Sequence, residues 1–86
     1  MKRNYYYENK TFSSYSKLEL SYTPPTNYTR LGFINVFAVG AVVNQFYIEE
    51  SSCTNSKIVV WNCGSSITCN INIYCLYIKT DYYKSL

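Results

Sequence analysis

Four cysteines are the residues whose type and spacing could carry chemistry: Cys53, Cys63, Cys69 and Cys75. Zinc ribbons and redox motifs place two cysteines three positions apart, and no pair here has that spacing. Four cysteines allow three disulfide connectivities, while unpaired cysteines pack as small hydrophobic groups. The pattern therefore predicts no metal site, and it leaves disulfides and free thiols open.

The remaining polar residues do not form a recognisable catalytic set. The chain has no histidine, which is the usual general base near neutral pH. Glu49 and Glu50 are the only adjacent carboxylates, and on a strand they would point to opposite faces. The serine pairs have no activating base beside them, and the three glycines are isolated. We therefore predict no enzymatic activity, no catalytic residues and no cofactor.

Tyrosine is the one marked compositional excess, with 11 residues in a chain of 86. Its ring gives a large contact surface with a polar tip and few rotatable bonds, which suits protein interfaces. Bias of the coding sequence toward AT is the alternative explanation. The tyrosines outside the expected core are predicted interface residues: Tyr5, Tyr6, Tyr7, Tyr15, Tyr22, Tyr28, Tyr82 and Tyr83.

The elements that position these residues fall into two regions, 1–30 and 31–86. The first is polar and tyrosine-rich, so we predict an arm with a short strand near 16–22. Leu18, Leu20 and Tyr22 would share one face of that strand. Two consecutive prolines at 24–25 should end it, because proline cannot donate to a strand ladder.

Residues 31–50 form the most hydrophobic part of the chain. We predict strands over 33–39 and 42–49, covered on both faces, with Gly40 at a bulge, bend or turn. A partly helical segment is the alternative. The apolar run is too short for a spanning helix of about 20 residues, and no apolar stretch follows the basic start as in a signal peptide.

The segments 57–62 and 67–79 are predicted to form a hairpin around Gly64. In the second segment the odd positions should face the core: Ile67, Cys69, Ile71, Ile73, Cys75 and Tyr77. In one register Cys53 would lie opposite Cys75, which gives Cys53–Cys75 and Cys63–Cys69 as candidate disulfides. A slip of one residue would turn these side chains to the other face.

Together these segments predict an all-β protein: a small single-domain antiparallel sandwich or barrel of about five strands with a tyrosine-rich N-terminal arm. Aromatic residues at 19% and charged residues at 15% argue against disorder. A net charge of +3 is too small to indicate nucleic-acid binding by itself.

The resulting functional expectation is a non-enzymatic structural subunit that self-associates, or docks on a virion or surface filament, through its arm and sheet edges. Its expected partners are other copies of the chain or other assembly subunits. The alternative is a small β-barrel that binds single-stranded nucleic acid or a host protein. A membrane-associated peptide built around 33–48 is a third class.

Overall fold

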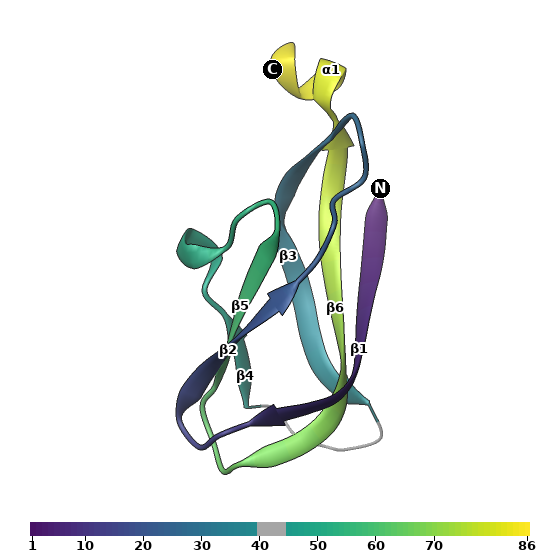
Figure 1. The fold of residues 1–86 in the computed structure, drawn as a ribbon. Helices are drawn as coiled ribbons and strands as arrows, with labels where there is room; N and C mark the ends of the chain where they lie inside the picture. The colour runs from purple at the N-terminus through teal and green to yellow at the C-terminus, as the bar shows by residue number, and fades with distance from the viewer. Residues whose placement is uncertain (40–44) are drawn as a thin grey trace.

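The computed structural model describes residues 1–39 and 45–86, apart from the side chains of Asn35 and Phe37. It confirms an all-β chain built from two antiparallel three-stranded sheets, β1-β6-β3 and β2-β5-β4 (Figure 1). Neither sheet is closed by the strands described. The strands are β1 (Lys2–Phe12), β2 (Ser16–Ser21), β3 (Tyr28–Val39), β4 (Phe46–Ile48), β5 (Lys57–Asn62) and β6 (Ile67–Lys79).

The predicted arm is wrong for residues 2–12, which form β1 and pair with β6. A register shift between Tyr7 and Lys10 places two β1 residues opposite one on β6. Asn9 lies in this bulge with φ of 50°, a conformation that asparagine tolerates better than most residues. The bulge changes which alternate positions face inward, so Tyr5, Tyr7 and Phe12 all pack toward the core. The division of the chain at residue 30 stays a prediction.

The short strand predicted near 16–22 is present as β2. Leu20 and Tyr22 are buried on one side, while Lys17 and Glu19 are exposed on the other. The segment containing the two prolines separates β2 from β3, as expected from their inability to donate hydrogen bonds. This part of the fold follows directly from local sequence pattern.

β3 is an edge strand with two irregularities in its pairing with β6. Register shifts lie between Arg30 and Gly32 and between Phe33 and Asn35. The extra residues at these bulges are Leu31 and Ile34, whose side chains are 51% and 53% exposed. The expectation of strands covered on both faces is therefore wrong here. Gly40 and the predicted strand start at 42 lie outside the described residues.

β5 and β6 do not form the predicted hairpin, because they belong to different sheets. β6 is the central strand of its sheet, with β1 on one edge and β3 on the other, so it has no free edge for β5. The buried Asn62 holds the connection between them: its side-chain amide donates to the carbonyls of Ser13 and Ser65, and its oxygen accepts from the Gly64 N–H. The short connection is thus a crossing between sheets.

The core lies between the two sheets and draws on both. The predicted inward face of β6 is confirmed, since Ile71, Ile73, Cys75 and Tyr77 are at most 1% exposed. Ile71 and Ile73 belong to a cluster that also contains Ile58 and Val60 of β5. Burial of this apolar surface is the main source of stability in so small a chain.

Two short helical segments complete the described chain: the 3₁₀ turn η1 (Glu50–Ser52) and α1 (Thr80–Lys84). None of the helices in the described part of the chain has the length and apolar character that a membrane crossing requires. α1 continues from β6, has no buried residue and projects beyond the ends of the sheets (Figure 1). Its side chains are therefore available to other molecules.

Candidate functional site

The two sheets meet along two seams, and tyrosine hydroxyls join them along the first. Tyr7 donates to the Ser21 carbonyl at 2.7 Å, which ties β1 to β2. Tyr5 donates to the Thr23 carbonyl at 3.2 Å, and its hydroxyl lies 2.7 Å from that of Tyr77. This seam is closed by contacts within the chain.

Buried phenols and a buried thiol lie behind this seam. Tyr22 stacks edge-on against Tyr5 and donates to the Thr54 carbonyl. Burial raises the pKa of Tyr77 and of Tyr22, and it also raises the pKa of the Cys75 thiol. These groups are therefore protonated near neutral pH, and a protonated thiol is a poor nucleophile. The cluster is suited to packing rather than to covalent chemistry.

The second seam, between β3 and β4, is organised by Glu50. Its carboxylate accepts from the Phe33 N–H and lies 3.7 Å from the Arg30 guanidinium. Arg30 also lies over the Phe33 ring, 4.9 Å from its centroid. A side chain at Gly32 would approach the Glu50 carboxylate to 3.3 Å, so the small residue permits this arrangement.

Beside this ion pair is a shallow hollow of about 280 Å³, here called the seam groove. The volume is slightly below the roughly 300–1,000 Å³ of small-molecule sites, so it suits side chains better than a ligand. Two of its residues are well exposed, Ile34 at 53% and Tyr47 at 58%. The groove is lined by Phe33, Ile34, Val36, Phe46, Tyr47, Ile48 and Glu50.

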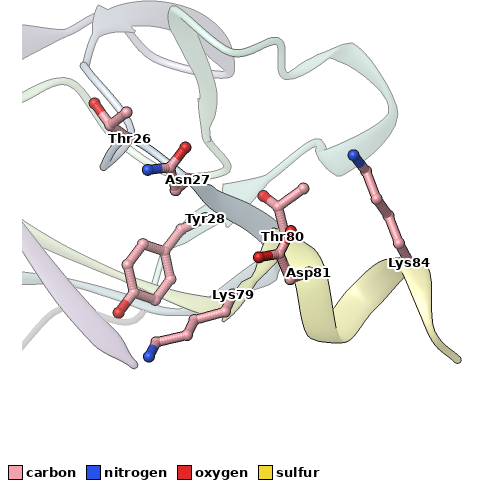
Figure 2. A pocket seen from close by; sticks show the side chains of 7 residues that line it. All are labelled: Thr26, Asn27, Tyr28, Lys79, Thr80, Asp81 and Lys84. Carbon is pink, nitrogen blue, oxygen red and sulfur yellow. The ribbon is translucent and has the colours of Figure 1, made fainter.

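A second hollow, the terminal pocket, separates α1 from the loop before β3 and has a volume of about 640 Å³. Figure 2 shows that its two ammonium groups point to opposite sides, Lys79 beside Tyr28 and Lys84 away from it. They do not converge on one ligand position, and Asp81 is the single carboxylate among the lining residues. The lining is Thr26, Asn27, Tyr28, Lys79, Thr80, Asp81 and Lys84.

The predicted interface tyrosines divide into two groups. Tyr22 lies in the core at 7% exposure, contrary to the expectation that it lies outside it, and Tyr5 and Tyr7 are half-buried with partners inside the chain. Tyr28 is half-buried in the terminal pocket. The exposed group keeps surface for a partner: Tyr6, Tyr15, Tyr82 and Tyr83. Their interface role stays a prediction.

The structure contains the four cysteines as free thiols, so it does not support the candidate disulfides Cys53–Cys75 and Cys63–Cys69. The pairing that placed Cys53 opposite Cys75 required a β5–β6 hairpin, whereas Cys75 lies between Arg3 and Phe33. Cys63 is exposed, Cys75 is buried, and the other two are intermediate. Within the described residues no cluster of three or more acidic, cysteine or histidine side chains could hold a metal ion.

Sequence reasoning missed the seam groove and the exposed bulge residues beside it. Leu31 and Ile34 look like core residues in an apolar run, and only the register shifts turn them outward. Gly32, which lies between them, is the one local indication of a bulge, since glycine in a strand often marks such a position. Tyr47 was likewise part of a segment assigned to a doubly covered strand.

Comparison of the chain with protein-family models, with curated proteins and with solved structures finds no match in any of the three. Its function must therefore be inferred from its own surface.

Proposed function

We propose that this protein is a non-enzymatic assembly subunit that associates with other copies of itself through the β3–β4 side of the molecule. The observation that carries the proposal is the pair of exposed aliphatic residues Leu31 and Ile34, which the β3 bulges turn to solvent beside the seam groove. Exposed apolar residues that adjoin a hollow lined mainly by aromatic and aliphatic residues are typical of protein interfaces.

The contrast between the two seams supports this assignment. On the β1–β2 side, the hydroxyls of Tyr5 and Tyr7 donate hydrogen bonds to backbone carbonyls of the same chain. On the β3–β4 side, Ile34 and Tyr47 leave more than half of their side-chain surface exposed. Contact with another subunit would bury this surface, which stabilises the assembly by about 25 cal/mol per Å² of apolar area.

We propose that the two sheets are the layers of a sandwich. Such a unit has separate sheet edges, which other subunits can approach, whereas a closed barrel has none. The bulges on β3 disrupt continuous strand addition at residues 30–35, so we propose side-chain docking as the mode of association there. The virion or surface filament as its setting remains the proposed biological context.

Size-exclusion chromatography with light scattering over a concentration series tests the proposal. The wild-type chain should form a defined oligomer or polymer at high micromolar concentration, in the presence of reductant. The variant Leu31→Lys/Ile34→Lys should remain a monomer, because two ammonium groups would have to be desolvated in the interface. The control Ser65→Lys/Ser66→Lys adds the same two charges at exposed residues between β5 and β6 and should assemble normally.

A wild-type chain that stays monomeric throughout the series would overturn the proposal. Equal assembly of the wild type and the Leu31→Lys/Ile34→Lys variant would also reject it, because association would then use another surface. Circular dichroism of each variant establishes that the β structure is retained. The substituted side chains are already exposed, so the fold should persist.

A second candidate function, single-stranded nucleic-acid binding, is favoured by one observation on the outer face of the β1-β6-β3 sheet. The Lys2 ammonium lies 5.2 Å from the centroid of the Tyr74 ring, and Tyr6 is exposed on the same strand as Lys2. Bases stack on aromatic rings next to cations in this way. Binding to a labelled oligonucleotide that weakens steeply with added salt would support this function.

A further inference from the structure

We propose that the occupant of the seam groove is the segment 80–86 of a second copy of the chain, so that assembly proceeds head to tail. This inference rests on the proposed function and specifies the partner of that surface. The segment 80–86 is here called the tail. Its attachment to a groove on the next copy leaves one free groove and one free tail at the ends of any open chain of subunits.

The tail has exposed aromatic and aliphatic side chains that its own subunit does not cover. Tyr82 is 61% exposed, Tyr83 is 49% exposed and Leu86 is 89% exposed. α1 has no buried residue, although the Thr80 N–H donates to the Asn27 carbonyl at 3.0 Å and fixes the start of the tail. A segment with three exposed apolar side chains outside the core is suited to contact with a partner.

The seam groove matches these side chains in character and size. Its walls are aromatic and aliphatic residues of β3 and β4, and Ile34 and Tyr47 form exposed parts of its rim. A hollow of about 280 Å³ is suited to aromatic rings rather than to a folded partner domain. Pairs of aromatic rings contribute about 0.5–1.5 kcal/mol beyond the burial of their area.

Charge complementarity favours the tail over other apolar segments of the chain. Glu50 is the single charged residue that lines the groove, and its side chain is 45% exposed. Lys79 and Lys84 flank the tail's aromatic pair, and the Lys79 ammonium lies 5.8 Å from the Tyr82 ring centroid. Asp81, the acidic residue of the tail, lies on the terminal pocket. An inserted tail would bring an ammonium group to the exposed part of the Glu50 carboxylate, whose other partners are Arg30 and the Phe33 N–H of the same subunit.

The geometry points to a second copy rather than to the subunit's own groove. Lys79 pairs with Tyr28 at the start of β3, whereas the groove begins five residues further along at Phe33. Five residues of strand span about 17 Å. From this position α1 projects beyond the ends of the sheets, away from the strands that line the groove (Figure 1).

Two variants separate the two halves of this contact. The tail variant Tyr82→Ser/Tyr83→Ser removes the aromatic rings, and the groove variant Ile34→Lys/Tyr47→Lys places cations on the rim. Each should be monomeric alone by light scattering at concentrations where the wild type assembles. Tyr15→Ser removes a tyrosine that is 74% exposed and belongs neither to the seam groove nor to the tail, so it should leave assembly intact.

An equimolar mixture of the tail variant and the groove variant is the decisive sample. One has an intact groove and the other has an intact tail, so the mixture should form a 1:1 heterodimer and nothing larger. A mixture that stays monomeric overturns the inference. Insertion of the tail into its own subunit would give that result, whereas a symmetric contact between two grooves would let the tail variant dimerise alone, which would also overturn the inference.

Failure of the inference is distinguishable from failure of the proposed function. If the wild type assembles and the tail variant assembles equally well, the tail is not the occupant, although the subunit still functions in assembly. If the wild type remains monomeric, both proposals are overturned. If a peptide of residues 79–86, which is the tail preceded by Lys79, also dissociates the wild-type assembly, the assignment of the tail is supported independently.

Discussion

The hydroxyls of Tyr5 on β1 and Tyr77 on β6 lie 2.7 Å apart, on two neighbouring strands at the edge of the core. Tyr77 is 1% exposed, so its hydroxyl takes its hydrogen-bond partners from the protein rather than from water. Tyr5 in turn donates to the Thr23 carbonyl, which connects the pair to the segment that follows β2. The residues expected to form a free arm therefore stabilise the chain's own fold.

This relationship predicts coupling between the two phenols. Tyr5→Phe and Tyr77→Phe should each lower the free energy of unfolding, and the double variant should lose less than the sum of the two. We expect a coupling energy of about 0.5–1.5 kcal/mol, the usual net value of one hydrogen bond. Urea unfolding of the four chains measures it. Strict additivity of the two losses would mean that the hydroxyls do not interact.

The buried tyrosines predict a loss of stability at alkaline pH. Burial raises the pKa of Tyr7 to about 12 from its ordinary value of 10.0. Between these values the unfolded chain releases the phenolic proton and the folded chain keeps it, so stability is complete below about pH 10 and falls toward pH 12. The raised pKa of Tyr22 and of Tyr77 acts in the same direction.

Urea midpoints measured across this range check the pH prediction. The midpoint should fall steadily above about pH 10, and the fall should be shallower in Tyr7→Phe. Tyr15→Phe serves as the control because it removes an exposed phenol, and its profile should match the wild type. A midpoint that stays constant up to about pH 12 would contradict the burial of these groups.

The β1 bulge predicts that the stability of the chain depends on which residue replaces Asn9. With φ of 50°, this residue lies in the left-handed region. Asn9→Gly should be tolerated, whereas Asn9→Val should lower the free energy of unfolding by about 1–2 kcal/mol. Thermal or urea unfolding of the two variants and the wild type measures this difference in stability. Equal stability of both variants would show that the strand does not require this conformation in solution.

The free thiols predict a graded reaction with a thiol reagent. Under native conditions without reductant, the exposed Cys63 should be modified first and the buried Cys75 last. Cys75 is fully buried, so a reagent should reach it only after global opening of the chain. Burial also raises the pKa of its thiol, which lowers the thiolate fraction. We therefore expect its reaction to be slower than that of Cys63 by more than about 1,000-fold. Mass spectrometry of digested samples follows each site. Recovery of disulfide-linked Cys53–Cys75 peptides would contradict the structure.

Local pattern alone was sufficient for several elements of this protein. The alternation from Ile67 to Tyr77 identifies β6 and its buried face, because side chains on a strand alternate between two sides. The alternation at Leu18 to Tyr22 and the following prolines locate β2 and its end in the same way. These features depend on neighbours in sequence, so no knowledge of distant segments was needed.

Tertiary structure decided which strands pair and which apolar residues are exposed. Both edges of β6 are taken by β1 and β3, so β5 pairs in the other sheet and the cysteine pairing inferred from a hairpin is lost. The bulges that turn Leu31 and Ile34 outward, and the one that brings Tyr5, Tyr7 and Phe12 to the same side, arise only when a strand is matched to its partner. Residue composition determines that this chain forms strands, whereas competition among strands for edges determines its sheets and its exposed surface.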